Sequence, residues 1–365
     1  MTSRLETRPR ADRARDLGLA ESALAELERS GFVVVPDFFC VTEVDAAREE
    51  LVRVLDLDAG MRRAKGCAAA DWREGPTPSS SSTGVMHTVL FPSLHCPTLA
   101  AMMDRLLESP MGRHFLRGAV GEHYRLRVDL GRITTGAHDV GPGGALPHDW
   151  HRDPPGEWTI GIFLADLEED GHSATAGLPG THVLPFNPYW DFMLSRPCYR
   201  SKAAYLDTQY RYMLDWFYRH NLFQGRVRRF FETRARGMFG RRGDWYFFFN
   251  DVWHGRQPNL FGRKLVMVRL GGFATEYPFK DDIPVPEFPA SVPRSYADHY
   301  RAGQPVNVGT DSLLQRMAAR QRAWHLDVFR LASAEKRWAS RLSRMLLARW
   351  PRLSEDRFLA TPKAP

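Results

Sequence analysis

The sequence predicts an α+β protein whose core is mainly β, of the barrel or jelly-roll type, with helices on its flanks. Residues 124–273 alternate short apolar runs with Gly, Pro and Asp, the pattern of short strands joined by turns rather than of βαβ units. Helical periodicity dominates on both sides of this stretch. The 22 Phe, 11 Tyr and 10 Trp among 365 residues need a large core or a pocket, which argues against a disordered chain.

The N-terminal part is expected to be helical around one strand. Residues 1–18 are polar and expected to be loose, and a helix follows over Glu21–Ser30. Phe32–Pro36 reads FVVVP, which predicts a short buried strand. Thr42 can cap a helix that runs to about Leu57. Residues 59–84 contain Gly, Pro and the run SSSST, and this predicts a loop that could serve as a lid.

Two more helices are predicted over Pro97–Glu108 and Met111–Val120. The strands expected after them are Tyr124–Thr134, Leu146–His151, Trp158–Leu164, Ala174–Leu178, Trp245–Phe249 and Lys264–Phe273.

Two helical regions complete the expected organisation. Tyr189–Arg242 is an aromatic and Arg-rich insertion, which is either a lid that grips an anionic substrate or a helical cover with a solvated basic face. A long amphipathic pattern returns over Asp311–Trp350, whose fate is packing on the core, a dimer contact or peripheral attachment to anionic lipid. We therefore expect a flexible N-terminus (1–20), one folded domain (21–280, with the helical insertion at about 189–242) and a helical C-terminal extension (281–365).

The bulk composition predicts a cytoplasmic protein. No apolar run approaches the roughly 20 residues that span a bilayer, and the charged N-terminus is not followed by the apolar segment of a secretory signal. The four cysteines stand singly, which fits a reducing compartment, and we expect all four to be small buried hydrophobes. The formal net charge of +7 permits an anionic partner without choosing one.

A candidate metal site joins two distant segments. In a strand, residues two apart point to the same face, so His151 and Asp153 of the sequence WHRD can present an imidazole and a carboxylate to one ion. About a hundred residues later, His254 supplies a second imidazole just after the apolar run Trp245–Phe249. Two His and one carboxylate form the facial set of non-haem iron oxygenases, which leaves positions open for a co-substrate and oxygen.

At this point the chain resembles the phytanoyl-CoA dioxygenase family. The similar segments, in order, are LERSGFVVVPDFF, WHRD, IGIFLADLEEDGHSATAGLPGTHVLP with its PGTH turn, and GDWYFFFNDVWHG. The resemblance spans roughly residues 22–275. It implies a double-stranded β-helix fold, an enzyme that uses Fe(II), 2-oxoglutarate and O2, and His151, Asp153 and His254 as the iron ligands. The carboxylate of Asp153 favours hydroxylation, since related halogenases lack it.

The resemblance also suggests how 2-oxoglutarate would be held. Its far carboxylate needs a cation, for which Arg263 is the first candidate, although the gap after the distal histidine is about two residues shorter than usual. Arg269 and Arg256 are the substitutes. Phe163 falls where an aromatic ring would pack against the co-substrate, and a core Phe is the competing interpretation. His182 is expected to stabilise the PGTH turn rather than bind metal. His148 is expected to contact the metal ligands without binding the metal itself.

Three functional hypotheses follow. The leading one is a hydroxylase acting on a small-molecule substrate, with an anionic compound as one option. The second is oxidation of a nucleic acid, prompted by the charge and the interleaved aromatics, although no nucleic-acid-binding module is evident. The third is a non-catalytic β-helix protein that binds a ligand without turnover.

Overall fold

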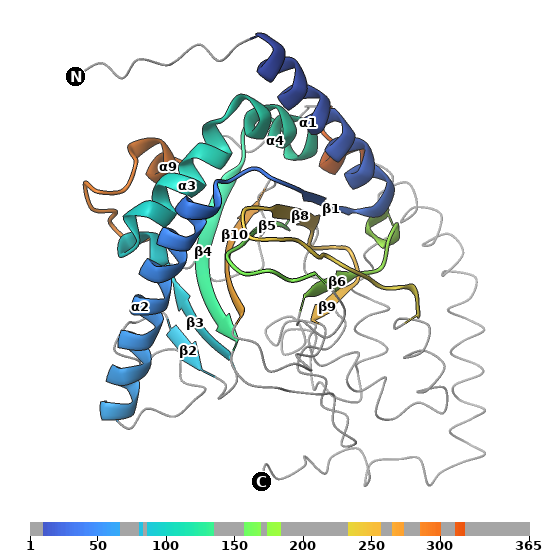
Figure 1. Ribbon diagram of the computed structural model, residues 1–365. Coiled ribbons are helices and arrows are strands. Elements are labelled where there is room, and N and C mark those ends of the chain that lie inside the picture. Colours follow the sequence, from blue (N-terminus) through green and yellow to red (C-terminus); the bar gives the residue numbers. More distant parts are fainter. Residues whose placement is uncertain are drawn as a thin grey trace, which may run out of the picture.

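The computed structural model describes residues 10–65, 80–82, 86–134, 157–168, 174–183, 233–256, 265–273, 285–300 and 311–317. Two antiparallel sheets organise this part of the chain (Figure 1). The larger has seven strands in the order β1 (Phe32–Val35), β8 (Trp245–Phe249), β5 (Glu157–Phe163), β10 (Leu265–Phe273), β4 (Arg125–Thr134), β3 (Met86–Leu90) and β2 (Ser80–Ser82). The smaller has the order β7 (Arg236–Gly237), β6 (Thr175–Gly177) and β9 (His254–Arg256).

Helices cover one face of the seven-stranded sheet, and the small sheet lies on the other side (Figure 1). They are α1 (Arg10–Ser30), α2 (Val41–Lys65), α3 (Pro97–Glu108) and α4 (Pro110–Val120), with a short α9 (Arg294–Asp298) and two single 3₁₀ turns, η1 (Pro92–Leu94) and η2 (Thr181–Val183). Ser109 separates α3 from α4, and its hydroxyl caps α4 by accepting from Gly112 N–H at 2.9 Å.

Strand β8 shows how one sequence serves both faces. Its sequence, WYFFF, shows no alternation of apolar and polar residues, and all five residues are buried. Successive side chains of a strand point to opposite faces. Trp245, Phe247 and Phe249 therefore join the core under the helices, whereas Tyr246 and Phe248 face the small sheet.

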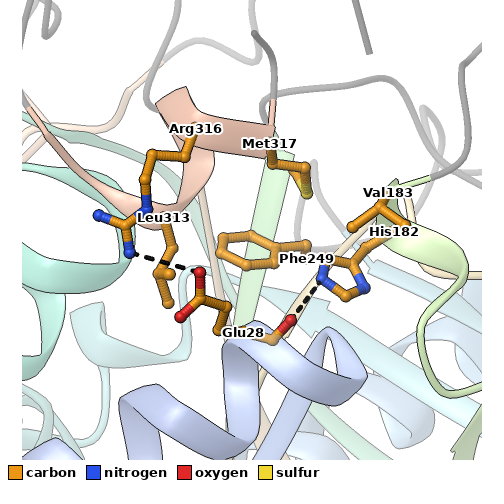
Figure 2. A pocket seen from close by; sticks show the side chains of 7 residues that line it. All are labelled: Glu28, His182, Val183, Phe249, Leu313, Arg316 and Met317. Atoms are coloured by element: carbon orange, nitrogen blue, oxygen red, sulfur yellow. Dashed lines mark hydrogen bonds and ion pairs between the residues drawn. The ribbon is translucent and has the colours of Figure 1, made fainter. Parts of the chain in front are cut away.

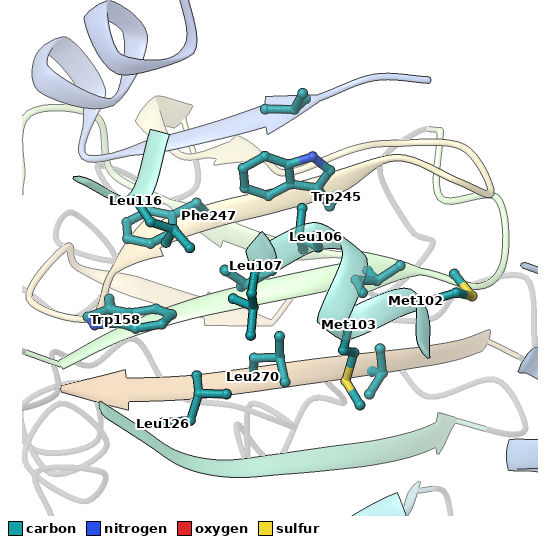
Figure 3. Packing of buried hydrophobic residues seen from close by; sticks show 14 of the residues in the cluster. Met102, Met103, Leu106, Leu107, Leu116, Leu126, Trp158, Trp245, Phe247 and Leu270 are labelled. Atoms are coloured by element: carbon teal, nitrogen blue, oxygen red, sulfur yellow. The ribbon is translucent and has the colours of Figure 1, made fainter. Parts of the chain in front are cut away.

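The main core lies between the helices and the large sheet. Leu106 and Leu107 of α3 lie over the sheet, near Trp158 of β5, Phe247 of β8 and Leu270 of β10 (Figure 3). The same cluster includes residues beyond position 285, namely Val292, Tyr296, Tyr300, Leu313, Leu314 and Met317. The start of the C-terminal region is thus part of this one core.

The structure confirms most predicted elements that fall on described residues and corrects several. The helix Pro97–Glu108 and the strand Trp245–Phe249 are found as predicted. Residues 10–18, expected to be loose, belong to α1, which begins at Arg10. Helix α2 continues to Lys65, into the expected loop, and Ser80–Ser82 of the serine run pairs with β3 as an edge strand.

At the end of the Arg-rich insertion, Arg236–Gly237 forms β7 and Gly240 bridges to Leu167, and the helical character expected for the insertion as a whole stays a prediction. One further expectation was wrong, because Cys40 is exposed rather than buried, whereas Cys96 is buried as expected. Cys67, Cys198 and the strand predicted over Leu146–His151 lie outside the described residues.

Helices flanking two antiparallel sheets make a mixed helix and sheet protein that fits a cupin-like fold. None of the helices within the described ranges is long and apolar enough to cross a membrane.

Candidate functional site

Two of the sequence-predicted site residues, His254 and Phe163, lie at the space between the two sheets. An apolar layer joins the sheets, with Phe32, Phe163, Tyr246 and Phe248 from the large sheet and Leu167, Met238 and Val252 from the opposite side. The polar side chains described beside this layer are what a ligand there could contact.

His254 opens β9 and points into the inter-sheet space. It is 5% exposed, and its ring lies 4.9 Å from that of Phe248, on the inner face of the large sheet. Its Nδ1 lies 2.9 Å from the carbonyl oxygen of Val252. A carbonyl can only accept, so this contact places the ring proton on Nδ1 and leaves the lone pair on Nε2. In the neutral ring, Nε2 is the nitrogen that could bind a metal ion.

The PGTH turn positions the strand that carries His254. Thr181 Oγ1 accepts from the backbone N–H of Trp253 at 2.9 Å, and Leu178 N–H donates to the Trp253 carbonyl at 2.9 Å. Both backbone groups of the residue before His254 are thus fixed. The turn itself is held against the end of α1, where Gly180 N–H donates to the Ser30 carbonyl at 2.9 Å.

His182 of the same turn has a structural role. It is buried, stacks on Phe249, and its Nε2 lies 3.1 Å from the Glu28 carbonyl oxygen (Figure 2). The cavity beside it, closed by Arg316 and Met317, measures only about 10 Å³, which is room for about one water. Gly31, with φ +83°, lets the chain turn against His182, because a Cβ there would lie 2.6 Å from the imidazole Nδ1.

Arg269 is the guanidinium of the inter-sheet space. It lies on β10 between Val268 and Leu270, which point to the helical core, so its own side chain points to the opposite face. Its Nε donates to the Tyr246 hydroxyl at 3.0 Å, and its Nη2 donates to Thr175 Oγ1 of β6. The side chain therefore bridges the two sheets.

Arg269 and His254 face the same space. Gly177 of β6 pairs with His254 of β9, and Thr175 lies two residues before Gly177, on the same face of the small sheet. Because Thr175 contacts Arg269 and His254 contacts Phe248, both residues of the small sheet face the large one. An imidazole and a guanidinium thus converge on one inter-sheet layer.

Gly161 makes room for the contact between Tyr246 and Arg269. In the sheet register, Arg269 pairs with Gly161, and Gly161 pairs with Tyr246, so the three residues form one row. A Cβ at position 161 would lie 2.0 Å from Cζ of Tyr246. The tyrosine ring occupies the space that a side chain at 161 would fill, and its hydroxyl reaches Arg269 across β5.

Phe163 is a buried member of the inter-sheet layer. It is 1% exposed, and its ring lies 5.1 Å from that of Tyr246, tilted by 49°. A Cβ on Gly240 would lie 2.5 Å from the Phe163 ring. Phe163 therefore packs against the tyrosine that contacts Arg269.

A chain of polar contacts braces the beginning of β5, directly after the WHRD segment. Thr159 donates to Asn250 Oδ1 at 2.9 Å, and Asn250 Nδ2 donates to Glu157 Oε2 at 3.2 Å. Arg127 Nη1 donates to Glu157 Oε1 at 3.4 Å, and this partly buried ion pair fixes the strand end. The four residues hold the beginning of β5 in the large sheet.

A second buried polar cluster lies on the helical face and serves packing. Desolvation raises the pKa of the Asp129 carboxyl, opposed by hydrogen bonds from Ser93 and Tyr300. Tyr300 donates to Asp129 Oδ1 at 3.0 Å, and its hydroxyl lies 2.8 Å from that of Tyr296. Burial raises the pKa of both tyrosines. This cluster fastens residues 285–300 to β4.

A larger hollow of about 540 Å³ lies between α1 and α4, in the helical layer. Its charged side chains pair with one another, His114 with Glu21 at 2.5 Å and Arg117 with Glu122 at 3.0 Å. It contains none of the predicted site residues.

Two of the predicted site residues, His254 and Phe163, are described, and the structure brings both to the inter-sheet space. His151, Asp153, His148 and Arg263 lie outside the described residues, so their roles stay predictions. Within the described ranges, no three His, Cys, Asp or Glu side chains form a group that could hold a metal ion.

Sequence reasoning placed Arg269 second to Arg263, and it missed Thr175, Tyr246 and Gly161. The only sequence signal for Tyr246 was that it is the second residue of WYFFF, so that in a strand it points to the face opposite Trp245 and Phe247. Gly161 was visible as a small residue within an apolar strand, a known sign of close approach by another group.

No protein-family profile and no curated protein sequence matches the chain. Solved structures that are similar in fold include HygX from Streptomyces hygroscopicus with nickel and 2-oxoglutarate bound, at 14% identity over 69% of this chain and 86% of that chain, with a TM-score of 0.43. A second is SnoK, a non-heme 2-oxoglutarate (α-ketoglutarate) dependent carbocyclase from nogalamycin biosynthesis, at 17% identity over 71% and 85% of the two chains, with a TM-score of 0.43. A third is the epimerase SnoN in complex with Fe3+, α-ketoglutarate and nogalamycin RO, at 14% identity over 70% and 84%, with a TM-score of 0.41.

Proposed function

We propose that the protein is an Fe(II)- and 2-oxoglutarate-dependent dioxygenase that hydroxylates a small-molecule substrate. We further propose that its core is a double-stranded β-helix like that of the phytanoyl-CoA dioxygenase family. The observation that carries the proposal is the convergence of His254 and Arg269 on one inter-sheet space. A metal ligand and a carboxylate anchor are the two fixed points that 2-oxoglutarate requires.

The residues suit the metal and the co-substrate chemically. Nε2 of His254 keeps its lone pair because Nδ1 faces a carbonyl. His151 and Asp153 would complete the ligand set, with the carboxylate suited to a ferrous ion that keeps positions open. Bound there, the iron would supply the oxidising chemistry, with O2 and 2-oxoglutarate consumed, succinate and CO2 released, and one oxygen atom added to a substrate C–H bond.

Arg269 is our candidate for the residue that binds the far carboxylate of 2-oxoglutarate. Among the described residues no carboxylate pairs with it, and its two recorded partners are neutral hydroxyls. Its positive charge therefore stays available to a ligand. A guanidinium offers a carboxylate two parallel hydrogen bonds. Arg263 is the alternative anchor, and Arg256, two residues after His254, is a third cation near the site.

The apolar residues around these groups would limit access of water to the reaction. Phe163, Phe248 and Val252 are each at most 1% exposed. Exclusion of water strengthens the interaction between Arg269 and a carboxylate, and protects a reactive oxidant from side reactions.

The test is succinate formation from 2-oxoglutarate by the purified protein under air, with and without Fe(II). We expect release that depends on Fe(II) and is stimulated by the right metabolite, with a product heavier by one oxygen atom. The variants His151→Ala and His254→Ala should each lose the activity, while His182→Gln, a change in a buried structural histidine, should keep it. Folded wild-type protein loaded with Fe(II) that never consumes 2-oxoglutarate against a broad metabolite panel would contradict the proposal.

A further inference from the structure

The contacts around Arg269 leave an excess of hydrogen-bond donors. Arg269 Nε donates to the Tyr246 hydroxyl and Nη2 donates to Thr175 Oγ1, so both hydroxyl oxygens act as acceptors. A hydroxyl that accepts still carries its own hydrogen, which needs an acceptor in turn. Among the described residues neither the Tyr246 hydroxyl nor the Thr175 hydroxyl donates to any acceptor.

Both hydroxyls are buried. Tyr246 is 1% and Thr175 is 4% exposed, so their hydrogens cannot rely on bulk water. Among the described residues the cluster therefore presents two O–H groups and a guanidinium, and no carboxylate or carbonyl accepts from either hydroxyl. Such a group of convergent donors is complementary to an anion with several lone pairs, and a carboxylate has about four acceptor sites.

We propose that Tyr246 is a specificity-determining residue of the 2-oxoglutarate site, an inference that rests on the proposed function. Its phenol oxygen fixes the Arg269 guanidinium through Nε, and its phenol hydrogen donates to the far carboxylate of 2-oxoglutarate. Thr175 fixes the other end of the guanidinium and joins the small sheet to the same carboxylate. Selection of a dicarboxylate over a 2-oxo acid without the second carboxylate follows from this arrangement.

Gly161 is what permits this use of a tyrosine. Tyr246 starts from β8, and the whole width of β5 lies between it and Arg269 on β10. The phenol reaches across because position 161 carries no side chain, and any Cβ there would overlap the ring. An alanine at 161 should push the ring away from Arg269, with the same consequence as removal of the hydroxyl.

The test is the affinity of the anaerobic, Fe(II)-loaded protein for two probes, measured by calorimetry. One is 2-oxoglutarate, and the other is 2-oxopentanoate, which has the same chain without the far carboxylate. Tyr246→Phe keeps the ring and removes the hydroxyl, so it should weaken 2-oxoglutarate binding by about 10- to 100-fold, as expected for hydrogen bonds to charged groups. Binding of 2-oxopentanoate should be unchanged. Gly161→Ala should reproduce the selective loss.

The matched control is Tyr124→Phe, the same change in a buried tyrosine on the helical face of the large sheet. It should alter neither affinity. Equal affinities of Tyr246→Phe and wild type for 2-oxoglutarate would overturn the inference and leave the proposed function standing, and so would equal weakening of both probes. Wild-type protein that binds neither probe would overturn the proposed function itself.

Discussion

Two buried polar side chains owe their state to their surroundings. Nδ1 of His254 faces a backbone carbonyl, so in the neutral ring the proton lies on Nδ1. Asp129 is fully buried among tyrosines and a backbone N–H, and desolvation raises its carboxyl pKa against those hydrogen bonds. The first contact orients the candidate metal ligand, and the second cluster fastens a segment to the core.

The raised pKa of Asp129 predicts a pH dependence of stability. Above the ordinary value of 3.8 the unfolded carboxyl loses its proton while the folded one still holds it, so the folded state binds more protons. The free energy of unfolding should therefore fall as pH rises from about 4 to the folded pKa, with a slope of at most about 1.4 kcal/mol per pH unit from this group.

Asp129→Asn removes the titrating group, so its free energy of unfolding in urea should lose this part of the decline. The control is Asp311→Asn, whose side chain is 88% exposed and should leave the slope as in wild type. An Asp129→Asn variant that follows the wild-type slope over the whole range would contradict the assignment.

At the scale of elements, the PGTH turn links the end of α1 to the strand of His254. Gly180 contacts Ser30 of α1, and Thr181 contacts the backbone of Trp253. The turn thus holds the strand of the candidate ligand in a fixed position relative to α1. The sequence motif is informative because its threonine and glycine make these two contacts, while its histidine packs on Phe249.

Thr181→Val should weaken metal binding without unfolding the protein. It removes the oxygen that accepts from Trp253 N–H, and with it the contact that fixes the backbone directly before His254. Loss of support behind a metal ligand typically costs about 10- to 100-fold in metal affinity. Competition titration with a chromogenic chelator measures this, and Thr181→Ser, which keeps the oxygen, should bind as wild type. Equal metal affinity of the Val variant and wild type would exclude this role of the turn.

Most elements could be predicted from the sequence, and strands β7 and β9 could not. Periodicity over ten or more residues locates α3 and β4 closely, and the strand predicted over Ala174–Leu178 is found as β6. Strand β9 has three residues and β7 only two, too few to show alternation. Their pairing depends on contacts between segments up to about eighty residues apart, which local pattern does not encode.

The candidate site was also only partly predictable from the sequence. His254 was predicted as a ligand because its residue type and neighbours form a motif; the structure places it beside Phe248, and its role as a ligand stays a prediction. The choice of Arg269 depends on the face of β10 on which it lies and on the register that aligns Gly161 with Tyr246. Tyr246 could not be predicted because WYFFF is a continuous apolar run, which does not show which residues face the site. Only the structure shows that β8 is buried on both faces and that Tyr246 lies on the face opposite the main core.

At the scale of the whole molecule, one face of the large sheet carries the main core and the other faces the candidate site. Its helical face carries a continuous apolar cluster that reaches from α1 to residues 313–317 and supplies the burial that stabilises the fold. Its other face carries a smaller apolar layer with His254, Arg269 and Thr175 set into it. Within the described residues, the main core and the candidate site thus lie on opposite faces of one sheet.

The most direct test of the account is an anaerobic titration of the metal-free protein with Fe(II) in the presence of 2-oxoglutarate, followed by the visible metal-to-ligand charge-transfer absorption. We predict one Fe(II) per chain and an absorption band in wild type and in His182→Gln, and no band in His254→Ala. A wild-type protein without the band, or a His254→Ala variant that develops it as wild type does, would contradict the assignment of His254 and of the site.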